Sequence, residues 1–492
     1  MTGLLLCGTE VNGRAPVDVR IAGGVVTEIG HRLSPGARED VIDARGGALI
    51  PGLCDHHLHL YAMAAASASV RCGPPAVTGP DALASALAGA QADEDGWVRG
   101  IGYGEDVAGL LDAAGLDRLH RERPVRLQHR SGALWVVNTA GARALGLADA
   151  EHPGIERDGQ SRPTGRLWRA DDWLRTRLPR SRPPDLRAVG ARLARLGITH
   201  VTDATPDLDT AAIEAIGTAT AESALPQHVQ LLGVPLGWAP AAGPGSPTAG
   251  PGSPATRPRP PTTQPHLPAA GPFKIILADS ALPDIGTLTD RIRSAHGAGR
   301  AVAVHCVTRE ALVLLLAALD DAGTRPCDRI EHAALVPAGL ISRLRGLALT
   351  VVTQPGFLTQ RGDDYVRDVP AAEHDDLYRA RSLLDGGVGC ALSSDAPYGP
   401  LDPWTVIKAA VHRTSPSGHV IGPAEDLTPA QALAGYLSPP DAPGAAARRV
   451  ASGSTADLVL LRVPLANALA APSADLVAAT LIDGSIVSAA SE

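Results

Sequence analysis

The chain has 492 residues, of which 45% are hydrophobic and 20% charged, and a formal net charge of −8 at pH 7. This size and composition are typical of a globular protein with one large domain or a few smaller ones. The mild acidity offers no basic footprint for nucleic acid, and no apolar run approaches the roughly 18 residues that a membrane span needs.

The cysteines and the first residues bear on the compartment. Six cysteines are scattered without Cys-x-x-Cys spacing, which predicts neither a disulfide framework nor a zinc finger. The segment Met1–Gly8 turns polar too soon for a signal peptide. We therefore expect a cytoplasmic protein that acts on a small-molecule substrate, without a nucleic-acid or membrane partner. The sequence leaves the oligomeric state open, and a homodimer remains an option.

Both ends of the chain have the pattern of short strands. Val17–Ile29 alternates about a Gly23-Gly24 turn, which is a hairpin signal. Near the other end, Ala456–Arg462 and Leu481–Val487 have a similar pattern. Segments at opposite ends most simply pair with each other. We predict a small β-sandwich module formed by residues 1–50 and 440–492, flanking a central domain at 51–439.

Strand and helix patterns alternate through the central domain. Helical patterns such as Arg309–Ala322 and Ala371–Leu384 separate apolar strand-like runs. The first predicted strand begins with Ala48-Leu49-Ile50 and leads to His57; the others are Ile198–Asp203, His228–Val234, Phe273–Ala278, Ala301–His305, Asp328–His332, Ala348–Gln354 and Val388–Asp395. Eight parallel strands that alternate with helices predict an α/β fold, a TIM barrel with its chemistry at the carboxyl ends of the strands.

Two segments interrupt this alternation. Residues 70–190 mix helix-like and strand-like pieces, and we interpret them as a large insertion or lid after strand one. Residues 235–272 are rich in Pro, Gly, Ala and Thr and cannot hold an ordinary crossover helix, so we expect an extended or disordered surface loop. The loop weakens the assignment of strand three, and a spacer role is favoured over partner binding.

Polar residues stand at the ends of the predicted strands. His57 and His59 are two residues apart on one strand, so both imidazoles face the same side. Two such nitrogen donors form half of the shell of a divalent metal. An isolated His-x-His pair is more often packed in the core or exposed to solvent than bound to a metal. However, His305, His332 and Asp395 end predicted strands five, six and eight, and a barrel would bring all five residues to one axial point.

Lysine is scarce in this chain. Of 44 basic residues, only Lys274 and Lys408 are lysine, and Lys274 lies within predicted strand four. A lysine can be deprotonated and can react, whereas an arginine effectively cannot. The two lysines are therefore candidates for amine chemistry, although codon drift could also have left them at random.

Taken together, these residues resemble the signature of the metal-dependent amidohydrolase superfamily. That signature has His-x-His on strand one, a lysine on strand four, histidines on strands five and six, and an aspartate on strand eight. Several sequence motifs resemble those of the branch that includes N-substituted formamide deformylases: Pro51–His59, Arg329–Ala333, Gln354-Pro355, Ser394–Pro397 and Gly453–Leu461. The likeness extends over nearly the whole chain.

The resemblance implies a site for one or two metal ions, most often zinc. His57, His59 and Asp395 would bind the more buried ion, and His305 and His332 the other. Lys274, carboxylated on its amine, would bridge the two ions. A mononuclear site with an uncharged or hydrogen-bonded Lys274 is the alternative.

The same resemblance implies hydrolysis of a C–N bond in a non-peptide amide, formamide or cyclic amide. The metal would make hydroxide available near neutral pH and polarise the carbonyl. Asp395 would act as general base and then as general acid. Two other readings remain. A ring aminohydrolase (deaminase) would carry a glutamate soon after a strand-five or strand-six histidine, and Glu310 lies five residues beyond His305. The third reading is a catalytically silent, ligand-binding barrel.

The chain departs from its apparent relatives around the pocket. It has Ser131-Gly132-Ala133, Ala278-Asp279-Ser280 and His305–Arg309 where relatives tend to carry Asp-Gly-His, Asp-Gly-Ser and His-x-x-Gly-Asp, and Trp168-Arg169 where a glutamate is common. These changes leave every presumed metal ligand in place, so we expect retained metal chemistry with an altered substrate. The pocket candidates are His129, Gln354, Tyr398 and Trp404, and for each of them ordinary loop packing is the competing interpretation.

Overall fold

The computed structural model describes residues 3–74, 76–179, 184–238 and 268–490. The chain forms two compact units, one comprising Met1–Leu60 with Asp185–Glu492 and the other comprising Tyr61–Pro184.

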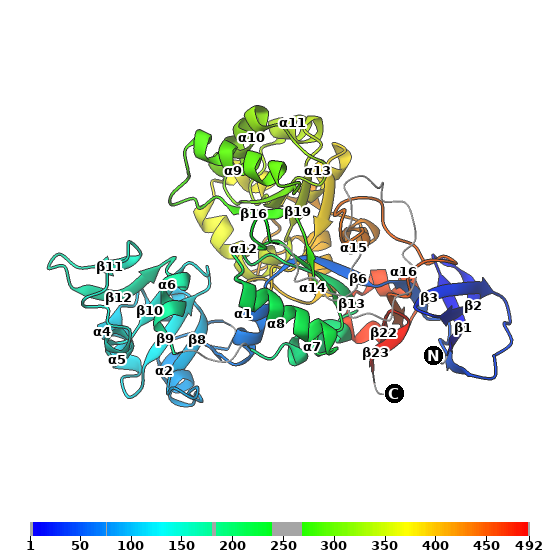
Figure 1. Ribbon diagram of the computed structural model, residues 1–492, viewed down its shortest axis with the longest axis horizontal. Helices are drawn as coiled ribbons and strands as arrows, with labels where there is room; N and C mark the ends of the chain where they lie inside the picture. Colours follow the sequence, from blue (N-terminus) through cyan, green and yellow to red (C-terminus); the bar gives the residue numbers. More distant parts are fainter. Residues whose placement is uncertain (1–2, 75, 180–183, 239–267, 491–492) are drawn as a thin grey trace. The chain divides into compact units, whose positions relative to one another are not determined.

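Both chain ends contribute to one eight-stranded sheet in the first unit. Its order is β23-β22-β21-β5-β1-β2-β3, with β4 paired to β1, and Figure 1 shows the blue and red strands beside one another. The strands are β1 (Gly3–Val11), β2 (Arg14–Ala22), β3 (Val25–Gly30), β4 (Glu39–Asp43), β5 (Ala48–Pro51), β21 (Leu458–Leu461), β22 (Val477–Ile482) and β23 (Ser485–Ala489). We call this sheet the β module. Its hairpin pairs Ala22 with Val25, as predicted.

The β module is held together by one apolar core that draws on both ends of the chain. Leu6 and Ile21 from the first strands pack in the same cluster as Leu458 and Leu481 from the last ones. Central β5 pairs with β1 on one side and with β21 on the other. Neither end can bury its apolar face without the other, because a single hairpin is marginally stable in water.

The first predicted strand needs a correction. Its leading run, Ala48–Ile50, belongs to β5 of the β module, and the barrel strand is β6 (Leu53–Leu58). Gly52 separates the two. A Cβ on Gly52 would lie 2.1 Å from Thr199 Oγ1, so only a glycine allows the chain to approach the next barrel strand here and pass from one sheet to the other.

The predicted central strands are present in the predicted chain order, in two parallel ladders. The first ladder is β15-β14-β13-β6 and the second is β16-β17-β18-β19-β20. Their bounds are β13 (Ile198–Asp203), β14 (His228–Leu231), β15 (Ala269–Ala270), β16 (Phe273–Ile276), β17 (Val302–Cys306), β18 (Arg329–His332), β19 (Thr350–Thr353) and β20 (Gly389–Leu392). Most residues of these strands are buried, as is usual where helices cover a parallel sheet.

Backbone hydrogen bonds join the two ladders at both seams. Lys274 N donates to Leu232 O at 3.2 Å, and Asp395 N donates to His57 O at 2.8 Å. The chain therefore has a TIM-barrel-like α/β fold. The predicted loop at 235–272 lies largely outside the described residues, although β15 falls within it.

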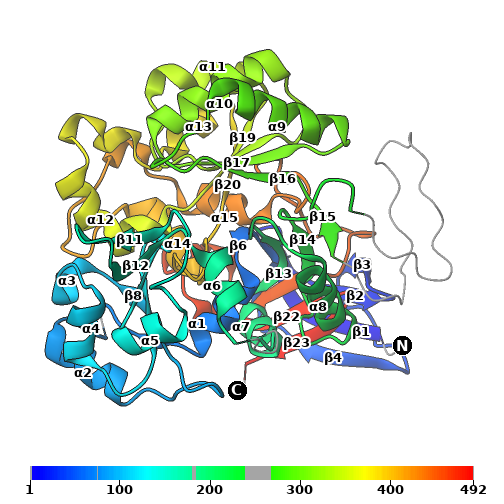
Figure 2. The same cartoon turned by 60° about the vertical axis from the view of Figure 1, so that its left-hand side comes forward.

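Helices connect these strands. Figure 2 shows α9 (Ile285–Gly297), α10 (Arg309–Ala322), α11 (Ile341–Gly346) and α13 (Ala380–Asp385) along the five-stranded ladder. Side chains cap their starts where the sequence offers an N-cap residue: Asp284 accepts from Thr287 N and Thr308 from Ala311 N. The remaining helices of this unit are α7 (Arg187–Arg195), α8 (Thr210–Ala221), α12 (Gly356–Asp368), α14 (Pro403–His412), α15 (Pro429–Leu437) and α16 (Leu465–Ala470), with 3-10 turns η1 (Ala338–Leu340), η2 (Ala371–Asp376), η3 (Pro423–Glu425) and η4 (Ala474–Leu476).

The helix predicted over Ala371–Leu384 is interrupted in its middle. The prediction of one continuous helix was therefore wrong. The segment forms η2, leaves helical geometry at Leu377–Arg379, and resumes as α13. Leu377 makes an isolated bridge with Leu335, and Tyr378 N donates to Ala334 O at 2.8 Å. These long-range backbone bonds replace the helical ones, a choice that local periodicity does not reveal.

The second unit is built on a six-stranded sheet of order β11-β12-β10-β9-β8-β7. Its elements are α1 (Leu60–Ser67, which starts at the boundary), β7 (Val70–Arg71), α2 (Pro80–Ala88), β8 (Val98–Tyr103), α3 (Glu105–Ala108), α4 (Ala113–Leu119), β9 (Val125–His129), β10 (Leu134–Val137), α5 (Thr139–Ala144), β11 (Ile155–Arg157), β12 (Pro163–Trp168) and α6 (Asp171–Arg177). Two apolar clusters of its own fill this unit.

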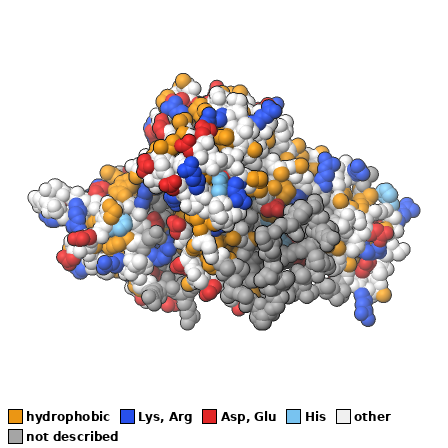
Figure 3. All heavy atoms as spheres, turned by 45° about the horizontal axis from the view of Figure 1, so that its top comes forward, with side chains coloured by type: hydrophobic (Ala, Val, Ile, Leu, Met, Phe, Trp, Pro, Cys, Tyr) orange, Lys and Arg blue, Asp and Glu red, His pale blue; other side chains and the backbone are white. Residues whose placement is uncertain are grey.

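The surface carries charges of both signs. On the face in Figure 3, acidic and basic side chains are interspersed instead of gathering by sign. Among the described residues, no helix combines the length and apolar character that crossing a membrane would require.

Candidate metal centre

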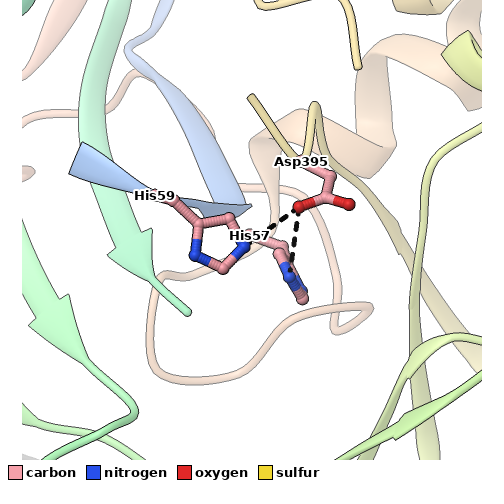
Figure 4. A group of neighbouring side chains, drawn as sticks. All are labelled: His57, His59 and Asp395. Atoms are coloured by element: carbon pink, nitrogen blue, oxygen red, sulfur yellow. Dashed lines mark ion pairs between the residues drawn. The ribbon is translucent and has the colours of Figure 1, made fainter. Parts of the chain in front are cut away.

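His57 on β6, His59 just after this strand and Asp395, which follows β20, converge on one point (Figure 4). Asp395 Oδ1 lies 3.2 Å from His59 Nε2 and 3.5 Å from His57 Nε2. One donor atom from each residue lies within 4.8 Å of the other two. His57 and Asp395 are buried, and His59 is partly so. Three nitrogen and oxygen donors this close together can serve as the ligands of a single cation.

The other two predicted histidines extend this group. The His332 ring centroid lies 4.7 Å from that of His57, and His332 Nδ1 lies 3.9 Å from Asp395 Oδ2. The His305 ring centroid lies 4.4 Å from that of His332. The structure thus brings together all four histidines and the aspartate: His57 on β6, His59 just after β6, His305 on β17, His332 on β18 and Asp395 three residues after β20.

Each of three histidines has a hydrogen-bond partner that sets its ring orientation. His57 Nδ1 is bonded to Glu331 Oε2 at 2.5 Å, and His59 Nδ1 to Thr205 Oγ1 at 3.2 Å. In both rings this leaves Nε2 facing Asp395. His332 Nδ1 is bonded to Gln354 Oε1 at 2.8 Å. Histidine ligands of metals usually have such outer partners, which fix the tautomer and the ring plane.

Burial keeps the central histidines neutral. It lowers the pKa of His57 and of His332 well below the usual value, and neighbouring positive charges, including that of Lys274, add to the effect. A neutral imidazole is the form that binds a metal. Burial and the neighbouring positive charges therefore favour metal binding by His57 and His332 at neutral pH.

Lys274 is buried on β16 and its Nζ makes no hydrogen bond to any described residue. Burial lowers the pKa of its ammonium group, against the opposing effect of the Glu331 and Asp395 carboxylates. A buried amine without a hydrogen-bond partner is costly and is more easily deprotonated. The position suits a reactive lysine more than a purely structural one.

The backbone at two of these residues is in the left-handed region. His332 has φ +70° and Asp395 has φ +53°, conformations that cost about 1–3 kcal/mol each for non-glycine residues and concentrate at functional sites. Asp55 helps to hold the second: its Oδ1 accepts hydrogen bonds from Ser394 N and His57 N, both at 3.2 Å. Burial raises the pKa of Asp55 to about 7.

The pocket candidates lie in different surroundings. Tyr398 packs edge-on against His59, with ring centroids 5.5 Å apart. Gln354 is buried beside His332, and Trp404 is fully buried in α14. His129 belongs to the second unit, where its Nε2 lies 3.0 Å from Glu105 Oε2.

Sequence reasoning missed Glu331, the partner of His57. This carboxylate is fully buried, and Arg329 Nε also donates to it, at 2.6 Å. The available signal was strand alternation, because Arg329 and Glu331 share a face of a strand predicted to be buried. A charged pair on such a face needs a structural or functional reason.

The donor set fits a divalent metal. Asp395 Oδ1 accepts no hydrogen bond from the described residues although it is buried, and two imidazole nitrogens face it. Imidazole and carboxylate donors of this kind suit zinc and other first-row cations.

Comparison with known proteins now adds to this geometry. The profile of the amidohydrolase family matches residues 40–488, which is most of the chain. The chain belongs to the amidohydrolase family. This amidohydrolase is therefore an enzyme that hydrolyses carbon–nitrogen bonds, as its sequence signature predicted.

Individual relatives of this amidohydrolase cover most of its length. The N-substituted formamide deformylase of Arthrobacter pascens is 27% identical over 493 aligned residues, which cover 89% of this chain and 87% of the relative. Among solved structures, an uncharacterized metal-dependent hydrolase from Pyrococcus horikoshii OT3 has a TM-score of 0.71 at 18% identity, covering 94% of this chain and 97% of that one. One from Pyrococcus furiosus has a TM-score of 0.64 at 19% identity, with 88% and 93% covered. At these identities the structures show a shared fold.

Proposed function

We propose that this amidohydrolase cleaves the C–N bond of a non-peptide amide, with an N-substituted formamide as the first substrate class to test and a cyclic amide as the second. The observation that carries the proposal is the convergence of His57, His59 and Asp395 beside His332 and the buried Lys274. The formamide class rests on the Arthrobacter relative.

His57, His59 and Asp395 would hold one divalent cation, with zinc favoured by the donor types. His305 and His332 would hold a second, and a carboxylated Lys274 would bridge the two. When bound, such a cation supplies Lewis acidity and makes hydroxide available near neutral pH.

The chain's own groups position the reactants and move the proton. Asp395 Oδ1 has no hydrogen-bond donor among the described residues, so it can accept a proton from an attacking water and return it to the leaving nitrogen. Glu331 and Thr205 keep the His57 and His59 rings turned toward Asp395. Tyr398, packed against His59, is placed to contact the substrate, whereas Gln354 acts through His332.

The ring-deaminase alternative has less support. Its acid would be Glu310, but this side chain is 65% exposed at the start of α10 and lies 3.9 Å from Arg309. A proton donor in that position would be surrounded by solvent. A catalytically silent barrel is disfavoured by the intact set of donor residues.

Several finer features belong to the same proposal. We place the enzyme in the cytoplasm, supported by six free cysteines. The central strands of the two ladders would close as a full barrel, with the β module packing as a sandwich. The partner would be a small-molecule substrate, and a homodimer is compatible with this scheme.

The test is a substrate panel of N-alkyl and N-aryl formamides, lactams, hydantoins and N-acyl amines. The assay follows release of formate and amine, or ring opening, with enzyme of measured metal content. Asp395→Asn is expected to lower turnover by roughly 10²–10⁴-fold while much of the metal is kept. Asp364→Asn, which changes an aspartate paired with Arg367 on α12, is the matched control.

Ammonia release from a ring amine, without amide cleavage, would favour the deaminase. A metal-loaded wild-type enzyme that turns over no member of the panel would contradict the proposed reaction.

A further inference from the structure

A second cluster of metal-ligand side chains lies away from the candidate metal centre. His200 on β13 and His228 at the start of β14 are register partners on neighbouring parallel strands. Their rings lie side by side, with centroids 4.6 Å apart and planes tilted by 32°. Asp457, the residue just before β21 of the β module, faces both of them. One donor atom from each residue lies within 4.8 Å of the other two.

The spacing of these donors is that of ligands around an ion. His228 Nε2 lies 3.1 Å from Asp457 Oδ1, His200 Nε2 lies 3.8 Å from Asp457 Oδ2, and Asp483 Oδ1 lies 3.7 Å from His228 Nε2. Metal–ligand bonds of about 2.0–2.1 Å in a tetrahedron place neighbouring donors roughly 3.3 Å apart. Only the first of the three contacts is short enough to be a hydrogen bond. The hydrogen bond accounts for the shortest contact, and the 3.8 Å contact between His200 and Asp457 is compatible with donors that share a cation.

Outer contacts fix these donors in place. Thr199 Oγ1 is 2.9 Å from His200 Nδ1, which leaves Nε2 of that ring facing Asp457. Asp457 Oδ1 also accepts from Asp483 N at 2.9 Å, and the Asp457 carbonyl accepts from Gly52 N at 2.7 Å. Asp457 is 3% exposed and His200 is 9% exposed. The side chains from β13, β14 and the β module are therefore held in position by the protein itself.

This cluster is separate from the candidate metal centre. His200 is in register with Cys54 on β6, three residues before His57, and three residues of a strand span about 10 Å. The cluster also faces the β module, whereas the centre at His57 lies toward the carboxyl ends of the strands.

We propose that His200, His228 and Asp457 bind a divalent transition metal of the zinc class. The ion ties the β module to β13 and β14 and has a structural role. Two imidazoles and one carboxylate supply three of the four ligands of a tetrahedral zinc shell, and Asp483, whose side chain is 47% exposed, lies at the edge of the cluster. The inference does not depend on the proposed reaction.

Metal counting tests this site. Purified protein is dialysed against metal-free buffer, and its metal content per chain is measured by elemental analysis for wild type and for the double variant His200→Ala/His228→Ala. The variant is expected to lose one equivalent. The control, His296→Ala, removes a histidine that is also paired with a buried aspartate, Asp328, at 3.1 Å, and should lose none.

A second measurement tests the site if the His200→Ala/His228→Ala variant fails to fold. Protein with His57→Ala and His59→Ala is stripped with a chelator and titrated with zinc chloride by calorimetry and in a thermal-unfolding assay. Zinc should still bind and raise the melting temperature. Because His305 and His332 remain in this background, Asp457→Asn assigns the binding to the second cluster: it should weaken one equivalent at least tenfold.

Two results would overturn the second site: an unchanged metal content in the His200/His228 variant, or no zinc binding by the stripped His57/His59 variant. Either result would leave the cluster as a hydrogen-bonded ion pair and would not touch the proposed hydrolase chemistry, whose failure would be seen only in the turnover assays.

Discussion

Replacing Glu331 with glutamine separates its two roles in this molecule. Its carboxylate is hydrogen bonded to His57 through one oxygen and to Arg329 through the other. The variant keeps the size of the side chain but removes the charge. The side chains of Arg329 and Glu331 are 1% and 0% exposed, so water cannot replace the lost partner.

The expected loss of stability in Glu331→Gln follows from this burial. Removing one member of a buried ion pair costs about 3–5 kcal/mol of unfolding free energy. Loss of the outer partner of a histidine ligand typically weakens metal binding by about 10–100-fold. Glu331→Gln should therefore show both effects, because one carboxylate serves both residues.

A matched control comes from a second buried arginine–glutamate pair. Glu425 Oε1 lies 2.9 Å from Arg379 Nη1, with side chains 2% and 10% exposed, and no histidine is bonded to either residue in the described hydrogen bonds. Glu425→Gln should lose comparable stability but keep the metal affinity of the wild type.

Urea unfolding of the chelator-stripped proteins measures stability without a contribution from bound metal, and competition with a chromophoric chelator measures metal affinity. Wild-type metal affinity in Glu331→Gln, together with a stability loss equal to that of Glu425→Gln, would refute the positioning role and leave Glu331 as a structural partner of Arg329.

Three further predictions concern the site and the thiols. Gly399→Ala would place a Cβ 2.2 Å from Ser394 O, next to Asp395, the proposed general base. Since displacements near 1 Å can cost about 100-fold in rate, kcat/KM should fall on that scale. Gly339→Ala, whose Cβ meets nothing within 4 Å, should retain the wild-type kcat/KM. Lys274→Arg cannot be carboxylated, so elemental analysis should show less metal per chain, and an unchanged content would favour a mononuclear site. Cys327 is exposed, in contrast to four buried cysteines, and the thiolate is the reactive form of cysteine. A thiol reagent at pH 8 should therefore react in a fast phase that Cys327→Ser removes. A fast phase that persists in this variant would contradict the described burial of the other cysteines.

The sequence by itself determined the order of the strands and the residues that meet at their ends. Strand periodicity of two placed His57 and His59 on one face, and the alternation of strands with helices put His305, His332 and Asp395 at equivalent strand ends. Lysine scarcity pointed to Lys274 and Lys408, and the position of Lys274 on predicted strand four distinguished the two. These features could be predicted because they depend on spacing between near neighbours in the chain and on the regular geometry of a parallel barrel.

Only the tertiary structure decided which distant residues share a buried charge or a ring contact. Glu331 is bonded to a histidine 274 positions away, and Asp457 reaches His228 across 229 positions. Ala48–Ile50 joined the β module, and the helix predicted over 371–384 was interrupted, because backbone groups there found partners in remote segments. Such pairings follow from packing, and packing is settled only when the whole chain has folded.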